Sequence, residues 1–348
     1  MFRRAMTLIV AAALLVGLAV GGMFLPVPYL VASPGLALNT LGERDGDRII
    51  QIDGHESYEH DGGLSMVTVQ YVGGPGARLD LFTALSAWLS PTQAVLPEEA
   101  IFPPDRSVEE ISETQTLQMD DSQQAAVAAA LGELEIDYER RAVVAGVSEG
   151  LPAEGRLEAG DVILEVDGAA VVGKEEAVRA IRDREPGDPV ELTVERDGET
   201  ERIPLDSTDL EGQAAVGALI GDDLTFPFDV HISVGDVGGP SAGLMFALGV
   251  MDHLSPDGLT GGHQIAGTGT ITADGVVGGV SGVEQKMVSA QRQGAEYFFV
   301  AADSCPQTFD SAATGEIEVV AVEELDDAVA ALDAIRTGEG LDELPRCS

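Results

Sequence analysis

The chain has 348 residues, of which 60 are acidic and 19 are basic, so that its net charge is −41. A negative field of this size repels nucleic acid and anionic membrane surfaces, and nucleic acid is therefore excluded as a partner. The length allows two or three domains. The two cysteines do not suggest a zinc site, and we expect neither a metal nor a cofactor.

The N-terminus carries the signal for the cell compartment. Arg3 and Arg4 precede an uncharged run from Ala5 to at least Leu25. Such a run can span a bilayer core of about 30 Å, and positive-inside bias keeps the arginines in the cytoplasm. A cleaved signal peptide is the alternative, but the apolar core is long for one and the cleavage signal is weak. We therefore expect a single-pass anchor within residues 1–35, with the rest of the chain outside the cytoplasmic membrane.

Residues 36–134 are predicted to form a membrane-proximal extracytoplasmic segment of short strands, followed by an alanine-rich helix from Gln123 to Leu134. His55 and His60 superficially match the zinc motif H-E-x-x-H. Their spacing is five residues rather than four, so they do not share a helix face. We assign no chemistry to this segment.

Residues 135–208 resemble a PDZ domain. The resemblance rests on L-E-A-G-D-V-I-L-E-V-D-G at 157–168, followed by a predicted helix over Lys174–Arg184 and a predicted strand over 190–194. PDZ folds bind extended peptides by adding a strand to a sheet edge. This resemblance implies a peptide partner.

Two details of this domain concern its ligands. The G-L-G-F loop that captures a peptide carboxylate is not evident at the expected place, where Arg140 and Arg141 stand instead as candidate carboxylate partners. Residues 168–174 match the phosphate loop G-x-x-x-x-G-K, but Glu175 replaces the hydroxyl that binds Mg²⁺. We therefore expect no ATP binding.

A glycine-rich turn, G-G-P-S-A-G at 238–243, precedes an apolar helix. Pro240 suits the first turn of a helix, which would place Ser241 at a helix N-terminus. Free N–H groups and the helix dipole can stabilise an oxyanion there. A simple capping serine is one alternative. The G-x-S-x-G nucleophile elbow is another, but it needs an acid and then a histidine downstream, and the last histidine, His263, follows too closely.

Lys286 lies in a second predicted helix, where Val283 and Ala290 share its side. A lysine that acts as a general base must lose its proton near neutrality, and its ordinary pKa of about 10.4 is too high for that. An apolar pocket lowers the pKa, whereas nearby carboxylates raise it, so the pocket must exclude carboxylates. The alternative is an ordinary surface lysine.

Three segments resemble Lon-type peptidases. Asp236–Gly243 resembles their nucleophile segment D-G-P-S-A-G, Thr268–Thr272 their T-G-E-I-T strand, and Gly282–Lys286 their G-L-K-E-K helix start. The resemblance covers about residues 212–335. Thr270 departs from the pattern, because Lon has glutamate there, and so does Val237, where many members carry a charge.

The resemblance implies a Ser–Lys dyad. Ser241 is then the nucleophile, Lys286 the general base and Thr268 the hydroxyl that orients the lysine, with Gly239 and Pro240 in support. It also implies a hydrolase that attacks peptide bonds. We see no other nucleotide-binding loop in the sequence, so we expect the chain to act without ATP.

The two cysteines of the chain are Cys305 and Cys347. In an oxidising compartment they can pair and hold the C-terminal tail, residues 341–348, against the catalytic domain. In the cytosol they would be two free thiols.

The expected fold class is α/β (α+β), with a transmembrane helix, a PDZ domain and a Lon-like domain (ribosomal protein S5 domain 2-like) at 209–340. This order is similar to bacterial membrane-anchored PDZ–Lon proteins. It implies an ATP-independent serine endopeptidase that cleaves unfolded or membrane-associated proteins outside the cytoplasmic membrane, with homo-oligomerisation left open. The alternative is a non-catalytic peptide-binding scaffold with a degenerate Lon-like domain, and the intact dyad argues against it.

Overall fold

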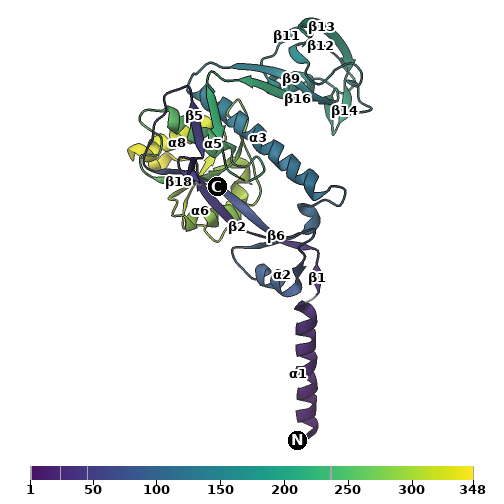
Figure 1. Ribbon diagram of the computed structural model, residues 1–348, viewed down its shortest axis with the longest axis vertical. Helices are drawn as coiled ribbons and strands as arrows, with labels where there is room; N and C mark the ends of the chain where they lie inside the picture. The colour runs from purple at the N-terminus through teal and green to yellow at the C-terminus, as the bar shows by residue number, and fades with distance from the viewer. Residues whose placement is uncertain (1, 24, 45, 236, 348) are drawn as a thin grey trace. The chain divides into compact units, whose positions relative to one another are not determined.

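The computed structural model describes residues 2–23, 25–44, 46–235 and 237–347. They form two compact units. The larger unit combines the chain up to residue 136 with the chain from residue 228 onward, and the inserted unit comprises residues 137–227. Figure 1 shows the course of the chain from purple to yellow. Asp236, the first residue of the segment that resembles Lon peptidases, lies outside the described residues.

Helix α1 (Phe2–Met23) opens the larger unit. Its stretch Arg4–Gly22 has a mean hydropathy of 2.3 and is long enough to cross a membrane. This confirms a candidate membrane span, although a signal sequence would share these properties.

A six-stranded sheet forms the centre of the larger unit. Four neighbouring strands are parallel, the fifth pairs antiparallel with the fourth, and the sixth pairs antiparallel with the fifth. In spatial order the strands are β22 (Glu318–Val322), β21 (Tyr297–Ala301), β18 (Gln264–Thr268), β6 (Gly63–Gly73), β2 (Tyr29–Asn39) and β8 (Ala94–Pro97).

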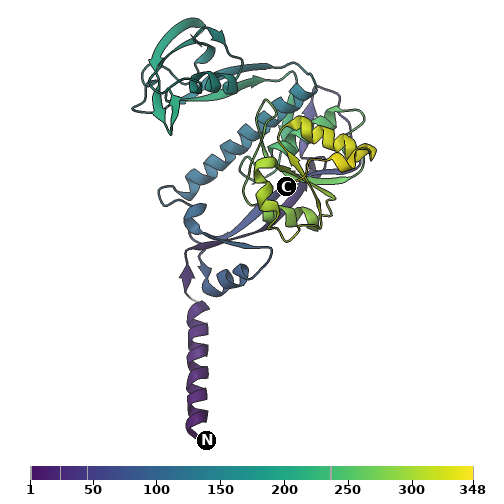
Figure 2. The ribbon, with the colours of Figure 1, turned by 180° about the vertical axis from the view of Figure 1, so that it is seen from behind.

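Helices α5 (Gly243–Leu254) and α6 (Val283–Arg292) cover opposite faces of this sheet. Successive strand residues point to opposite sides. Ala266 shares a buried cluster with α6, whereas a Cβ at the next residue, Gly267, would lie 2.6 Å from Met245 Sδ on α5. The other helices are α2 (Leu81–Trp88), α3 (Val108–Glu133), which packs on α5, α7 (Cys305–Thr308) and α8 (Leu325–Thr337, yellow in Figure 2).

Short strand pairs complete the larger unit. They are β1 (Pro26–Val27) with β7 (Leu79–Asp80), β3 (Glu43–Arg44) with β4 (Asp47–Arg48), β5 (Ile50–Asp53) with β17 (Asp229–Ile232), and β19 (Thr270–Ile271) with β20 (Val277–Gly278). Near the C-terminus, Cys305 and Cys347 form a disulfide. The pairing expected for an oxidising compartment is therefore present.

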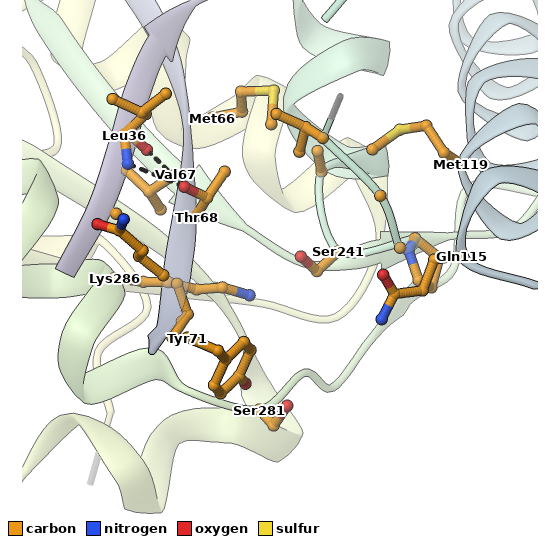
Figure 3. A pocket seen from close by; sticks show the side chains of 18 residues that line it. Leu36, Met66, Val67, Thr68, Tyr71, Gln115, Met119, Ser241, Ser281 and Lys286 are labelled. Carbon is orange, nitrogen blue, oxygen red and sulfur yellow. Dashed lines mark hydrogen bonds between the residues drawn. The ribbon is translucent and has the colours of Figure 1, made fainter. Parts of the chain in front are cut away.

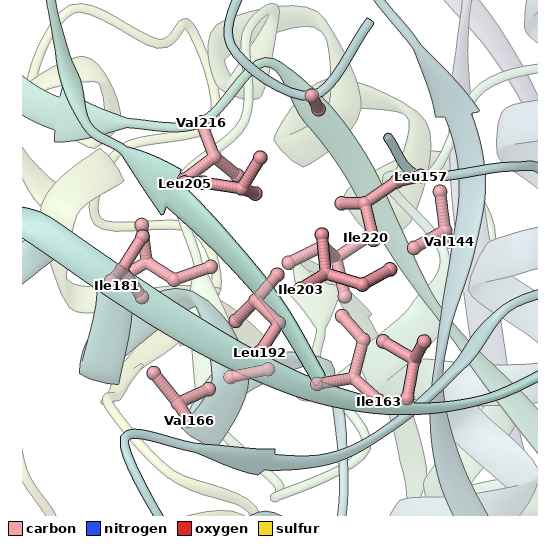
Figure 4. Close-up of a cluster of buried hydrophobic side chains, with 14 of the residues drawn as sticks. Val144, Leu157, Ile163, Val166, Ile181, Leu192, Ile203, Leu205, Val216 and Ile220 are labelled. Atoms are coloured by element: carbon pink, nitrogen blue, oxygen red, sulfur yellow. The ribbon is translucent and has the colours of Figure 1, made fainter. Parts of the chain in front are cut away.

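The inserted unit is a second sheet, in the order β13-β12-β10-β9-β16, packed against α4 (Lys174–Arg182). Its core is aliphatic, and Figure 4 shows Val144, Ile163, Leu192 and Ile203 meeting within it. The strands are β9 (Glu139–Val147), β10 (Val162–Val166), β11 (Ala169–Ala170), β12 (Pro189–Arg196), β13 (Glu199–Asp206), β14 (Thr208–Leu210), β15 (Gln213–Ala215) and β16 (Ala218–Thr225).

The expected domain boundaries differ from these units. Residues 36–134 do not form a separate segment, because β6 is a central strand of the larger unit's sheet and α3 packs on α5. Strand β16, which falls within the domain expected at 209–340, pairs with β9 in the sheet of the inserted unit. The physical reason is the parallel pairing of β6 with β18, which joins chain segments on either side of the insertion.

Candidate active site

The turn before α5 holds Ser241 at the edge of a pocket. Helix α5 begins at Gly243, with Ala242 as its N-cap, so Ser241 lies one residue before the cap. The expectation that Pro240 occupies the first turn is wrong. A Cβ at Gly243 would lie 2.8 Å from Ile271 Cγ2 and 2.9 Å from Ser122 Oγ, so the helix start packs too closely for a larger residue.

The main chain of Ser241 is fixed to the end of β18. Its carbonyl oxygen accepts hydrogen bonds from Gly269 N at 3.0 Å and from Thr268 Oγ1 at 2.9 Å. Just before Ser241, the backbone N–H of Gly239 donates to Gln115 O on α3 at 3.0 Å. Pro240 O accepts from Ser122 Oγ, also on α3, at 3.0 Å. The segment is therefore held from two sides, by β18 and by α3.

Lys286 lies in the first turns of α6. The helix begins after Gly282, whose φ of 72° is left-handed and whose Cβ position lies 2.7 Å from Val69 Cγ2 on β6. Only glycine fits both conditions. This close approach buries Lys286 to 4% exposure, and the burial lowers the pKa of Lys286 to about 8.

The side chain of Thr268 contacts both Ser241 and Lys286. It is fully buried, its Oγ1 donates to Ser241 O, and the same oxygen accepts from Lys286 Nζ at 3.0 Å. Within the described chain, no hydrogen bond joins Ser241 Oγ to Lys286 Nζ. Catalytic hydrogen bonds are commonly long before a substrate binds.

Ser241 and Lys286 both point into one cavity of about 590 Å³ (Figure 3). This volume lies in the range of small-molecule and peptide-side-chain pockets. Its walls include Met66, Val67 and Tyr71 from β6, and Met119 from α3. Among the described residues that line it, none is acidic. The pocket thus has the exclusion of carboxylates that a low lysine pKa requires.

Sequence reasoning missed the walls of this pocket, because it gave residues 36–134 no chemistry. Strands β2 and β6 supply Leu36 and residues 66–71, and α3 supplies Gln115 and Met119. A local signal for α3 was available: Ser107 and Glu110 form a capping box at its start.

The two arginines expected at a peptide site are engaged elsewhere. Arg140 Nε donates to Asp222 Oδ1 at 3.0 Å, and its guanidinium also contacts Glu175. Arg141 pairs with Asp223. Strand β9, which carries both, is paired on each side and is not a sheet edge. These partners neutralise both charges, and the arrangement does not favour carboxylate capture by either arginine.

The edge strands of the inserted sheet are β13 and β16, and a cavity of about 710 Å³ lies between β16 and α4. The chain enters β16 through Gly217, whose φ is 81°. Sequence reasoning sought a carboxylate loop before β9. The available signal was Val216–Leu219, an apolar–glycine–small–apolar run at the start of the edge strand β16.

The histidines behave as structural residues. His60 Nε2 hydrogen-bonds with Ser255 O at 2.9 Å, and His55 Nδ1 with Glu56 O at 2.9 Å. Within the described ranges, no group of three His, Cys, Asp or Glu side chains could hold a metal ion.

Two family models match this chain. A model of the Lon protease (S16) C-terminal proteolytic domain matches residues 219–333, and a PDZ domain model matches residues 117–206. A search of curated proteins found no match.

Among solved structures, the PDZ domain of the SdrC-like protein Lin2157 from Listeria innocua is 30% identical, covering 23% of this chain and 92% of its own, with a TM-score of 0.22. The PDZ domain of the SdrC-like protein Lmo2051 from Listeria monocytogenes is 28% identical, covering 23% and 85%, with a TM-score of 0.22. GtR34C from Geobacillus thermodenitrificans is 32% identical, covering 22% and 92%, with a TM-score of 0.21.

The family matches confirm the predicted PDZ and Lon-like domains. The chain therefore carries a PDZ domain and a Lon protease (S16) C-terminal proteolytic domain, with an N-terminal apolar helix that is a candidate membrane anchor.

Proposed function

We propose that this chain is an ATP-independent serine endopeptidase, with Ser241 as nucleophile and Lys286 as general base. The observation that carries the proposal is the hydroxyl of Thr268, which bonds the main chain of Ser241 and Nζ of Lys286 at once. The match to the Lon proteolytic domain supports the same reaction class.

In the first step, neutral Lys286 accepts the proton of Ser241 Oγ as that oxygen attacks the scissile carbonyl carbon. The C–O bond forms, and the carbonyl oxygen becomes an oxyanion. The lysine ammonium then gives its proton to the leaving amine while the C–N bond breaks, which leaves an acyl ester on Ser241. Water hydrolyses the ester with Lys286 again acting as base.

The oxyanion needs hydrogen-bond donors that are fixed beforehand. The backbone N–H groups of Ser241 and Ala242 donate to no described residue, and they lie at the positive end of the α5 dipole. We assign the oxyanion site to these two groups.

The lowered pKa of Lys286 makes the base available. With a pKa of about 8, roughly a tenth of the lysine is neutral at pH 7, against about one part in a thousand or fewer for an ordinary lysine. The neutral form is the active one, so the rate of hydrolysis should rise with pH through about 8 and then level off.

The substrates we propose are unfolded or membrane-associated polypeptides, and the reaction would take place outside the cytoplasmic membrane. Arg4 at the start of the apolar helix supports this orientation, as does the disulfide, which persists in oxidising compartments. At the phosphate-loop match, the backbone N–H of Lys174 in the first turn of α4 donates to Asp222 Oδ1 at 2.8 Å, which supports action without ATP because a carboxylate occupies the place of a phosphate.

The test compares two serines of the same pocket. Ser241→Ala should reduce hydrolysis of unfolded casein by roughly 10³-fold or more, because the nucleophile is lost. Ser281→Ala is the matched control, since Ser281 also lines the pocket but has no role in the reaction. Addition of ATP should change neither rate. Equal activity of the Ser241→Ala variant and the parent would refute the proposal and leave the peptide-binding scaffold as the alternative.

A further inference from the structure

A helix on the surface of a water-soluble protein usually buries its large apolar side chains, whereas helix α2 exposes them. Its alanines, Ala84 and Ala87, face the protein, while its large apolar side chains face outward. Trp88 and the following Leu89 are each 71% exposed, and three further residues are 40–47% exposed: Leu81, Phe82 and Leu85. Exposed apolar residues that gather on one helix mark a contact surface.

The same region carries no charge in a strongly charged chain. Residues 81–97 contain no Asp, Glu, Lys or Arg, and neither do residues 5–42, whereas 23% of the whole chain is charged. The acidic remainder of the molecule resists approach to a lipid surface. The uncharged face of α2 is therefore the face that can approach one.

Helix α2 is also joined directly to the end of the candidate membrane span. Strand β1, which follows α1, pairs with β7, which precedes α2, in the register Pro26↔Asp80 and Val27↔Leu79. At the last turn of α1, a Cβ on Gly22 would lie 2.9 Å from Phe82 Cε2. Figure 1 shows α2 beside β1 at this end of α1. A bilayer that holds α1 thus has its surface at the level of α2.

We propose that α2 is an interfacial helix, which lies on the lipid bilayer where α1 emerges and inserts Phe82, Leu85 and Trp88 at the boundary between headgroups and acyl chains. Tryptophan favours this boundary because its ring is apolar and its N–H is polar. An apolar helix face in contact with lipid gains the free energy of burial without crossing the membrane. The proposal rests on membrane anchoring by α1 and not on the peptidase chemistry.

The contact would set the height of the catalytic pocket above the membrane. Tyr71 lines that pocket, and two residues later on the same strand a Cβ at Gly73 would lie 3.0 Å from Leu79, just before α2. A strand advances only about 3.3 Å per residue. The docked helix would hold one wall of the pocket close to the bilayer surface, where segments of membrane proteins leave the lipid.

The experiment uses Trp88, which is the single tryptophan of the chain. The full-length protein is placed in phosphatidylcholine nanodiscs, whose two faces are both open to solutes. Its fluorescence is then measured with lipids brominated in the upper acyl chain and, separately, with acrylamide in the water. The control is the double variant Trp88→Phe, Phe309→Trp, because Phe309 is 52% exposed and lies after α7.

We expect brominated lipids to quench Trp88 at least twofold more than the tryptophan at 309, and acrylamide to quench it less. Equal quenching of both tryptophans by acrylamide, with no effect of bromine on Trp88, would overturn the proposal. Protection of Trp88 from both quenchers would also overturn it, and would indicate a second copy of the chain as the occupant of this face. None of these readings depends on peptidase activity.

Discussion

The chain has two lysines, and they lie in opposite surroundings. Lys174, at the start of α4 in the inserted unit, is 45% exposed and lies 3.9 Å from a carboxylate oxygen of Glu175. Lys286, in the larger unit, is buried, and its Nζ has a neutral partner, the hydroxyl of Thr268. No described ion pair joins Lys286 to a carboxylate, although the chain has 60 acidic residues. The difference indicates that Lys174 is a solvated surface cation, whereas the surroundings of Lys286 allow it to lose its proton more easily.

Two arginines of the inserted unit differ from Lys286, because each lies beside carboxylates. Arg140 is half-buried between Asp222 and Glu175, and Arg196 donates to the buried Asp161 at 2.6 Å. Paired charges of this kind stabilise the charged form. These arginines and Lys286 therefore differ in their immediate neighbours. The difference can be tested by changing the lysine itself or the residues around it.

The largest expected effect on activity comes from Lys286→Arg, compared with the same change at Lys174. Lys286→Arg should lower casein hydrolysis by roughly 10³-fold or more, because a guanidinium keeps its proton and cannot act as a base. Lys174→Arg is the matched control and should retain the parent rate, since that lysine only carries surface charge. An active Lys286→Arg variant would rule out the lysine-base mechanism.

Thr268→Val removes the hydroxyl and nearly keeps the volume. Ser241 O and Lys286 Nζ each lose a partner, and we expect activity to fall roughly tenfold to a hundredfold, with an altered pH profile. Thr270→Val, two residues along the same segment, is the control. If the Thr268 variant lost activity but kept the parent pH profile, Thr268 would have a structural role and would not position the base.

Gln115→Glu tests the need for a pocket without carboxylates. Gln115 lines the pocket from α3, and a carboxylate there should stabilise the ammonium form and raise the pKa of Lys286. The pH–rate curve should then move to higher pH, and the rate at pH 7 should fall roughly two- to fivefold. Gln118→Glu adds the same charge to an exposed position of α3 and should leave the curve unmoved. Equal curves for the two variants would contradict the role assigned to the pocket.

The smallest effect on activity is expected at the disulfide, which lies outside the described lining of the pocket. Cys305→Ser should leave the rate unchanged at low temperature. In the chain-entropy model, it should lower the free energy of unfolding by roughly 3 to 4 kcal/mol. In the parent, thiol labelling of the non-reduced protein without denaturant should find no reactive thiol. Two reactive thiols would reject the bridge and weaken the extracytoplasmic placement.

The sequence indicated the candidate residues that lie in short motifs, and their catalytic roles stay a prediction. Ser241, Thr268 and Lys286 meet as the resemblance to Lon peptidases implied, because the turn, the strand end and the helix start are each encoded locally by glycines. The start of α5 was misplaced, since Pro240 satisfies a helix start as well as the turn that precedes one.

The pocket walls were beyond the reach of local patterns. Strand β6 pairs with β18 across the whole inserted unit, and no short-range signal in residues 63–73 indicates that partner. The edge strand β16 was missed for a related reason, because it follows β15 in the chain but pairs with β9. In both places non-local strand pairing decides the fold, and this pairing is not visible in the period of the residues.

The most direct test of the central claim is the rate at which a fluorophosphonate labels Ser241, measured against pH with the parent protein. The reaction needs only the nucleophile and its base, so it is free of substrate binding and product release. If Lys286 activates Ser241, the labelling rate should rise with pH as one group titrates at about 8, and Lys286→Arg should abolish labelling. A rate that stays constant from pH 6 to pH 10, or labelling of the Lys286→Arg variant at the parent rate, would contradict the account.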